Sequence, residues 1–212
     1  MITPKDHFSY SQYTLFKSSP AWYFKRYFKG IEYNGGFEFG RKVADSLEKD
    51  ICPTAELKLL NTFIKKYPIM DYEISVELDG IPIYARFDGF DDTGLELGEY
   101  KTGDIKYPWT QSRADRHVQI DWYYLMIYLK YKELIKKATL HYIPVLREKD
   151  NFGNILKEEI IFEKMVDFET RRTVVDISRL TIDIKRTWKE INDLSEFYLL
   201  KGYVIIKGKR YE

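Results

Sequence analysis

Hydrophobic residues recur along the chain with two different periods, and the change of period separates helical from extended segments. Up to about residue 68 the apolar positions lie three or four residues apart, which is the spacing of a buried helix face. Ser, Thr, Pro and Gly residues interrupt this pattern where helices start or stop. We therefore expect three helices here: residues 8–28 with an interruption at Ser18–Pro20, about Phe37 to Lys49, and Thr54 to Tyr67.

From residue 72 to residue 103 the alternation has a period of two, which is typical of strands that bury one face. Asp79-Gly80 is the kind of dipeptide found in two-residue hairpin turns. The sequence Asp-Asp-Thr-Gly at 91–94 gives a second turn signal. We therefore expect a three-stranded meander.

The second half of the chain returns to helical spacing twice. A long helix is expected from near Thr110, and its middle is apolar on almost every side, so it should be largely buried. A strand expected at 138–145 follows that helix, as a crossover to a parallel neighbour requires. The remaining elements expected are a turn at 148–154, a strand at 155–164 and a helix at 167–197.

This order of elements predicts an α/β fold in which helices flank a mixed central sheet. The 212 residues fit one domain, 1–212. Its core is expected at about 37–145, with helical additions at both ends and a C-terminal strand and long helix at about 155–200. Hydrophobic residues make up 44% and charged residues 32%, in agreement with a packed core under a solvated surface.

Charge and cysteine content limit the partners and the compartment. The net charge is +1, so any nucleic-acid binding must depend on a local patch. The single cysteine, Cys52, excludes a disulfide framework or a cysteine metal cluster within one chain and favours a reducing compartment. There is no signal-peptide pattern, and no apolar run approaches the ~18 residues needed to span a bilayer. We expect a cytoplasmic protein without a membrane partner.

The stretch Leu-Glu-Leu-Gly-Glu-Tyr-Lys-Thr-Gly at 95–103 carries the candidate chemistry. Glu99 and Lys101 share a face of the expected strand, and charges on such a face are costly unless they are paired or bound. Asp88 lies near the same end of the preceding strand. The two carboxylates and the backbone carbonyl of Tyr100 suit Mg²⁺ or Mn²⁺. Lys101 can orient or deprotonate a water, or neutralise developing charge.

A simpler interpretation of the same residues stays open. Asp88 can cap the turn that follows it, and Glu99 and Lys101 can form an exposed ion pair of little energetic value. Asp/Glu-x-Lys is a weak pattern that also occurs at 56–58, 104–106 and 183–185.

The combination of Asp88 with Glu99-Tyr100-Lys101-Thr102-Gly103 resembles the PD-(D/E)XK nuclease superfamily, and within it the RecB-like exonuclease branch. Three further stretches carry the resemblance, which spans about residues 8–145: 8–24 is similar to the N-terminal helix of the branch, 39–48 to its Gly-x-x-x-His-x-x-x-Glu helix, and 119–123 to its Gln-x-x-x-Tyr motif. The resemblance implies a restriction-endonuclease-like core and a metal-dependent DNA nuclease, with exonuclease activity more typical than endonuclease activity.

The resemblance also implies roles for individual residues. Asp88 and Glu99 would ligate the metal, and Lys101 would be the catalytic lysine. Gln119 and Tyr123 lie one helical turn apart and would contact the nucleic acid and support the lysine region. Core packing is the alternative role for both side chains.

Two positions depart from the family pattern. The helix histidine of the family falls at Ala44, which cannot coordinate a metal, so Glu48 one turn later is a candidate replacement ligand, directly or through water. Ser19 stands where the branch often has the first cysteine of an iron–sulfur cluster. No iron–sulfur cluster is therefore expected.

A nuclease must also hold a polyanion, and the partner expected here is DNA, as single strands or duplex ends. Arg113 and Arg116, just before the motif helix, and Arg41 and Lys42 are candidates for phosphate contacts. Arg86, two residues before Asp88, can hold the Asp88 carboxylate or a phosphate. The chain has no helicase motif, so any unwinding would come from a helicase or recombination partner.

The sequence leaves three hypotheses. The first is a metal-dependent nuclease. The second is a catalytically weak nucleic-acid-binding or partner-recruiting module on the same fold, weakened by Ala44. The third is an unrelated α/β protein, for which Asp88 and Glu99 would point to opposite faces of the sheet.

Overall fold

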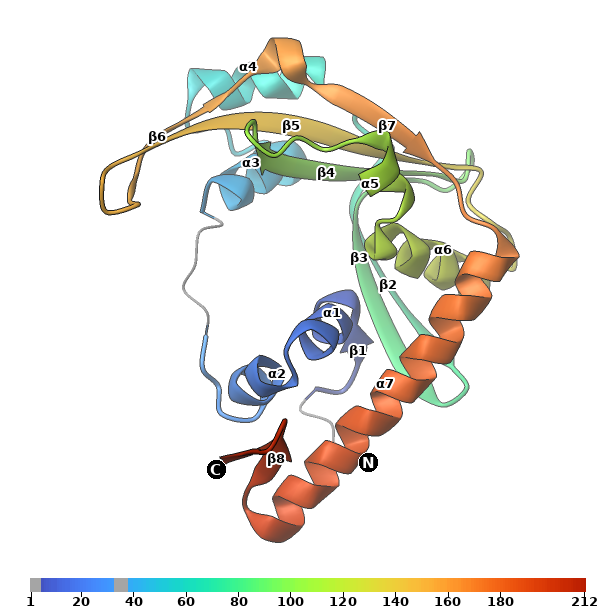
Figure 1. Ribbon diagram of the computed structural model, residues 1–212. Helices are drawn as coiled ribbons and strands as arrows, with labels where there is room; N and C mark the ends of the chain where they lie inside the picture. The colour runs from blue at the N-terminus through green and yellow to red at the C-terminus, as the bar shows by residue number, and fades with distance from the viewer. Residues whose placement is uncertain (1–4, 33–37) are drawn as a thin grey trace.

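The computed structural model describes residues 5–32 and 38–212 as a seven-stranded mixed sheet flanked by helices (Figure 1). The sheet order is β1-β3-β4-β5-β6, with β2 paired to β3 and β7 paired to β5. The strands are β1 (Phe8–Ser9), β2 (Ile69–Leu78), β3 (Ile81–Asp91), β4 (Glu96–Asp104), β5 (Lys137–Lys149), β6 (Ile155–Ile160) and β7 (Val166–Thr170). The helices are α1 (Tyr10–Ser18), α2 (Pro20–Tyr27), α3 (Glu38–Lys49), α4 (Ala55–Phe63), α5 (Gln111–Asp115), α6 (Val118–Tyr131) and α7 (Val174–Lys201).

The predicted meander and the predicted parallel pair are both confirmed. Strands β2, β3 and β4 run antiparallel in sequence order, and Asp79 and Gly80 both have positive φ at the first turn, as a tight hairpin requires. After α5 and α6 the chain returns as β5, and its residues 137–145 pair in parallel register with the whole of β4. The α/β fold expected from the sequence is therefore the observed one.

Strands β3 and β4 are paired only near their shared turn, at Gly89↔Gly98, Phe90↔Leu97 and Asp91↔Glu96. Beyond Gly98 they part, and the backbone N–H of Tyr100 donates instead to the Asp88 carboxylate at 2.8 Å. The ring of Tyr67 packs where the pairing ends, and a Cβ atom at Gly89 or Gly98 would collide with it. Because neither glycine has a side chain, the Tyr67 ring fits at the point where the two strands separate.

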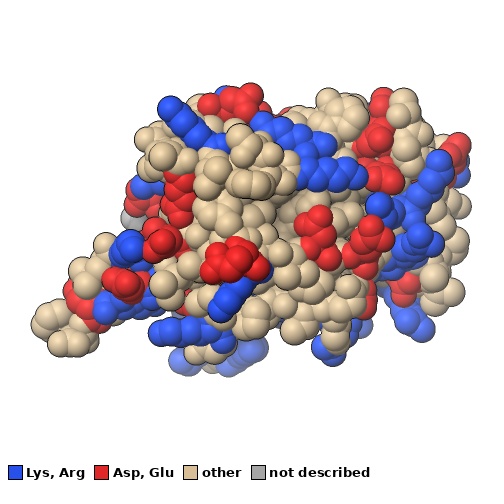
Figure 2. Space-filling view, turned by 90° about the horizontal axis from the view of Figure 1, so that it is seen from above, with Lys and Arg blue, Asp and Glu red and all other residues tan. Residues whose placement is uncertain are grey.

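Two apolar clusters cover the sheet. Helices α1, α6 and α7 pack against β2 and β3 around the buried Trp122, and α3 and α4 pack against β5 and β6 around Leu47 and Leu60. Viewed from above the sheet, basic and acidic side chains are interspersed (Figure 2), in keeping with the net charge of +1. In the described ranges no helix combines the length and the apolar character needed to cross a bilayer.

The single helix expected from Thr110 is two helices, with a break at Arg116 and His117. The guanidinium of Arg172 donates to the backbone carbonyls of Ala114 at 3.2 Å and His117 at 3.3 Å. These bonds give each carbonyl a second donor beside its backbone N–H, so the interrupted turn is tied to a residue more than fifty positions away. The prediction of one continuous helix was wrong for that reason.

Other boundaries also differ from the prediction. The helix expected from residue 167 begins at Val174, after β7, because residues 166–170 pair with β5. The third helix ends at Phe63, the strand at 155–164 ends at Ile160 before a 3-10 turn (Phe162–Lys164), and Phe8–Ser9 is a short strand. A C-terminal hairpin, β8 (Val204–Ile206) and β9 (Lys209–Tyr211), was not predicted. The expected start of the second helix at Phe37 lies outside the described residues.

Candidate active site

The candidate site lies where β3 and β4 separate, and Glu99 is at its centre. Its side chain is only 2% exposed, and each carboxylate oxygen has a partner. One oxygen pairs with the ammonium of Lys101, and the other accepts the Tyr123 hydroxyl at 3.0 Å. Glu99 and Lys101 therefore share a face of β4, as their spacing predicts, with Glu99 buried and Lys101 half-buried.

The ammonium group of Lys101 lies between two oxygen acceptors from different elements. Besides Glu99, it donates to the side-chain carbonyl of Gln119 on α6, at 2.8 Å. Burial lowers the pKa of Lys101, but the Glu99 and Asp88 carboxylates raise it by more, so the pKa stays above its ordinary value. Lys101 is therefore a fixed cation at neutral pH.

Asp88 occupies the end of the gap between the two strands. One of its oxygens accepts the Tyr100 N–H, and no described residue donates to the other. Burial and then the charge of Glu99 raise the pKa of Asp88 well above its usual value, although Lys101 and the Tyr100 N–H oppose the shift. The site thus holds two carboxylates, Asp88 and Glu99, against the single ammonium group of Lys101.

Gln119 and Tyr123 join α6 to this cluster. The Gln119 side-chain amide donates to the Tyr123 hydroxyl, which contacts the Glu99 carboxylate and the backbone carbonyl of Arg86, both at 3.0 Å. The amide of Gln119 is therefore satisfied on both sides by residues of the site. Its contacts are polar, unlike those of the core-packing role considered from the sequence.

Glu48 and Arg86 form an adjacent ion-pair network. The Glu48 side chain is 8% exposed and accepts from Arg86 at 2.6 Å, and Arg86 also pairs with Asp71 on β2. Burial raises the pKa of Glu48 although Arg86 opposes the shift, and the charge of Glu48 in turn raises the pKa of Asp88. Of the two roles expected for Arg86, holding the Asp88 carboxylate is wrong, because its guanidinium is bound to Glu48 and Asp71, while contact with a phosphate stays a prediction.

The oxygen atoms at the gap can be compared with the ligands that a divalent cation prefers. In a strand the N–H and C=O of one residue point to the same side, so the Tyr100 carbonyl faces the gap, as its N–H does. With Asp88 and Glu99 it gives an all-oxygen set, which suits Mg²⁺ or Mn²⁺ with water completing the shell. Within the described ranges no three His, Cys, Asp or Glu side chains converge as a ready-made metal site. Glu48, held by Arg86, is not a formed third ligand.

The two departures from the family pattern have clear structural settings. Ala44 lies on α3, one turn before Glu48, and offers no donor atom. The hydroxyl of Ser19 accepts the N–H of Trp22 and caps α2, so this position has a local structural role.

Apart from Arg86 on β3, the basic residues proposed for nucleic-acid contact lie on α3 and on or just after α5. Arg41 and Lys42 are exposed on α3, where Lys42 pairs with Glu38 at 2.9 Å. On α5 the guanidinium of Arg113 stacks over Trp109, 4.1 Å from the ring centre. Arg116 binds the hydroxyl and the carbonyl of Ser112, each at 3.0 Å.

Sequence analysis did not identify the residues on the opposite face of β4. The ring of Tyr100 stacks on His141 with centroids 5.0 Å apart, and His141 bonds to Tyr67 at 3.1 Å and to Asp167 at 2.7 Å. A histidine in a strand flanked by apolar residues was the available signal. This network fixes the residue whose backbone binds Asp88.

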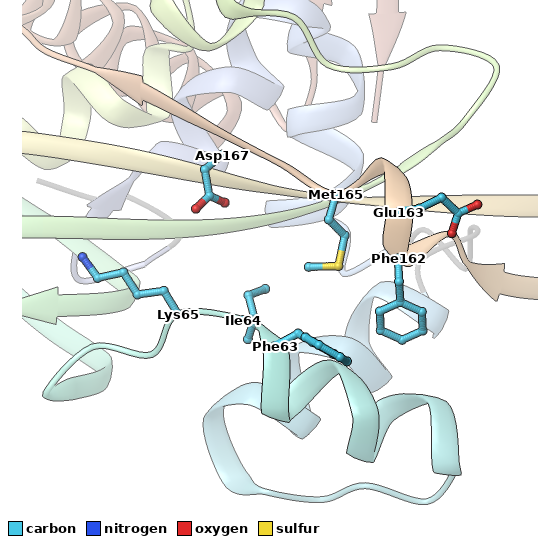
Figure 3. Close-up of a pocket in the computed structure, with 7 residues that line it drawn as sticks. All are labelled: Phe63, Ile64, Lys65, Phe162, Glu163, Met165 and Asp167. Carbon is cyan, nitrogen blue, oxygen red and sulfur yellow. The ribbon is translucent and has the colours of Figure 1, made fainter.

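A cavity of about 570 Å³ borders this network, away from the carboxylate cluster (Figure 3). Figure 3 shows Phe63, Phe162 and Met165 on one side and Lys65 and Asp167 on the other. A smaller cavity of about 170 Å³ instead adjoins the site itself. Its lining residues are Ser9, Tyr10, Ser11, Tyr84, Ala85, Arg86, Gln119 and Tyr123.

Comparison with known proteins gives a likeness of fold. No protein-family profile and no curated protein sequence matches the chain. The crystal structure of a protein from Eubacterium rectale named "Putative exonuclease" superimposes with a TM-score of 0.52 at 12% identity, over 89% of this chain and 82% of that one. The crystal structure of SSO0001 covers 89% of this chain and 78% of its own, also at 12% identity, with a TM-score of 0.44. At such identity the first likeness supports the mixed α/β fold alone, and the second is too weak to add to it.

Proposed function

We propose that this chain is a divalent-metal-dependent nuclease that hydrolyses phosphodiester bonds of DNA, as a RecB-like member of the PD-(D/E)XK superfamily. The observation that carries the proposal is the position of Lys101. Its half-buried ammonium is held by the buried Glu99 and by Gln119, close to the Asp88 carboxylate, at the gap between two strands. An exposed ion pair would have neither this burial nor these partners.

In this proposal Asp88, Glu99 and the Tyr100 carbonyl hold Mg²⁺ or Mn²⁺. A bound cation supplies positive charge that stabilises the charge developing on the phosphate oxygens. Lys101, protonated at neutral pH, presents a second positive charge and can orient a water through its free N–H. Gln119 and Tyr123 keep Lys101 and Glu99 in place. The proposed substrate is DNA as single strands or duplex ends, with any unwinding left to a helicase or recombination partner.

The direct test is cleavage of end-labelled linear and closed-circular DNA, single- and double-stranded, with Mg²⁺, Mn²⁺ or a chelator. Wild-type protein is compared with Glu99→Ala. We expect metal-dependent cleavage by wild type only, and cutting of circles would identify an endonuclease. Cleavage by Glu99→Ala at the wild-type rate would refute the assignment of the site.

A second candidate function is a nucleic-acid-binding or partner-recruiting module on the same fold. The observation that favours it is the incomplete ligand set, because Ala44 offers no donor and Arg86 binds Glu48. This module would bind DNA and leave it intact with every metal. Thermal stabilisation by Mn²⁺ that Asp88→Ala abolishes, together with cleavage, would instead support the nuclease.

A further inference from the structure

A groove of about 470 Å³ lies where the first turns of α6 and α7 meet α1. Four arginines and four aspartates contribute its charged lining. The groove flanks the α6 residues next to Gln119, since Val118 and Asp121 are part of its wall. In Figure 1 the N-terminal end of α7 lies beside α6, and α1 lies on the same side of the sheet. The groove therefore lies against the first turn of α6, the helix that also carries Gln119.

The aspartates of the groove are already bound within the protein. Asp121 pairs with the buried Arg172, and Asp115 accepts from the Gln111 amide at 2.8 Å. Asp176 accepts the N–H and the hydroxyl of Thr173, as the cap of α7.

The fourth aspartate is surrounded by cations. Asp183 accepts the Tyr13 hydroxyl at 2.5 Å and pairs with Lys17 at 3.0 Å and with Arg186. Because Arg186 also pairs with Glu190, two cations face two carboxylates here, and the negative charge of Asp183 is compensated at the edge of the groove near α1.

Three arginines of the groove, unlike its aspartates, have no ion-pair partner among the described residues. Across residues 5–32 and 38–212, no carboxylate lies within 4.0 Å of the guanidinium groups of Arg116, Arg171 or Arg179. Among the described residues the Arg116 guanidinium bonds to Ser112 alone, and Arg171 and Arg179 are exposed. A guanidinium is a bidentate donor that matches a phosphate, and these three have donors to spare.

Tyr10 connects the groove to the candidate site. It lines the small cavity that Gln119 and Tyr123 also line. Its ring contacts the ring of His117, with centroids 6.3 Å apart, and His117 lies in the chain between the groove residues Arg116 and Val118. Only Tyr10 and the start of α6 therefore separate the groove from the residues of the site.

We propose that Arg116, Arg171 and Arg179 form a phosphate-binding track for the nucleic-acid strand that leads to or from the candidate site. This inference rests on the proposed nuclease function. It assigns substrate binding to Arg171 and Arg179, which lie in a part of the chain with no resemblance to the nuclease motifs. The ligand class is the phosphodiester backbone, and the contact is independent of base sequence.

The test measures binding separately from cleavage. All variants carry Glu99→Gln, and Ca²⁺ replaces the catalytic metal. Fluorescence anisotropy with a short fluorescein-labelled strand and its duplex is recorded over a series of NaCl concentrations. The test variant is Arg171→Gln with Arg179→Gln, and the control is Lys189→Gln with Lys201→Gln, which removes the same charge from the far part of α7.

We expect the test variant to bind roughly tenfold more weakly than the control at low salt. The slope of log affinity against log salt should fall by about 1.4 for the single strand, because two phosphate contacts are lost. Arg171→Lys with Arg179→Lys should retain most of the salt dependence. Circular dichroism checks that each variant is folded.

Equal affinity and equal salt slope in the test and control variants would overturn the track, while cleavage by wild type would leave the nuclease assignment standing. Conversely, arginine-dependent binding without any cleavage by wild type would keep the track and remove the proposed catalytic function. Weaker binding with an unchanged salt slope would show that the arginines act through structure and would also overturn the track.

Discussion

The ammonium of Lys101 on β4 and the side-chain carbonyl of Gln119 on α6 are 2.8 Å apart. This bond joins β4, which carries Glu99, to α6. Among the described residues the Lys101 ammonium has one other acceptor, Glu99, so Gln119 sets the direction in which the ammonium points. In the proposed nuclease, a lysine anchored on both sides would act on a phosphate without rearrangement.

Gln119→Leu should therefore lower kcat for DNA cleavage by about 10- to 100-fold, the effect of losing a charge-assisted hydrogen bond of about 1.5–3 kcal/mol. Lys101→Ala should abolish cleavage with folding intact. Both are measured by steady-state cleavage of a labelled strand with Mn²⁺, with Gln111→Leu on α5 as the surface control. Undiminished turnover of Lys101→Ala would exclude the proposed role of this lysine.

Residue spacing was sufficient to predict the central geometry of the site. The period of two places Glu99 and Lys101 on one face, and a four-residue spacing places Gln119 and Tyr123 on one side of α6. The meander and the parallel β4–β5 pair also follow from local turn signals and from the intervening helical segment.

The features that sequence analysis missed depend on contacts between distant residues. Arg86 pairs with Asp71 and Glu48, from a strand and a helix that local patterns do not bring together. The helical spacing of apolar residues is the same before and after residues 116–117. It therefore gave no sign of the break there, which Arg172 stabilises. Strand β7 precedes the capping box of Thr173 and Asp176, which was the one local signal for the true start of α7.

Gly98→Ala should destabilise the protein by about 1–3 kcal/mol, because the added methyl group collides with the Tyr67 ring at the end of the β3–β4 pairing. The measurement is urea unfolding of the single variant and of Gly98→Ala with Tyr67→Leu. Removing the ring should restore part of the loss that Gly98→Ala causes. Simple additivity of the two substitutions would show that the ring and the glycine do not interact.

We expect Arg172 to stabilise the break between α5 and α6. Its buried guanidinium pairs with Asp121 and bonds to two backbone carbonyls, which also accept the N–H groups of His117 and Ile120. Arg172→Met should therefore cost about 3–5 kcal/mol, chiefly by leaving the Asp121 carboxylate without its cation. Urea unfolding measures the loss. Asp121→Leu combined with Arg172→Met should be less destabilised than Arg172→Met alone, and a more destabilised double variant would contradict this account.

Asp88 should make the metal-free protein less stable as the pH rises. Its pKa in the folded chain lies well above the ordinary value of 3.8, so the carboxyl group is neutral in both states at low pH. Stability is then fully present below the unfolded pKa and is lost as the pH rises through the folded pKa. Asp88→Asn should remove this loss and raise the Tm at neutral pH in a chelator, by roughly 2–4 °C for each kcal/mol recovered.

Asp91→Asn is the matched control, because the N–H of Gly94 and the Thr93 hydroxyl hold the pKa of Asp91 below its usual range. Its contribution has the opposite sign: it is present above the unfolded pKa and is lost as the pH falls, so Asp91→Asn should lower the Tm at neutral pH. Thermal unfolding from pH 4 to pH 8, with and without Mn²⁺, distinguishes the two. Mn²⁺ should stabilise wild type and Asp91→Asn but not Asp88→Asn, since only the last lacks a carboxylate at the gap. Equal Mn²⁺ stabilisation of all three would mean that the cation binds elsewhere on the protein.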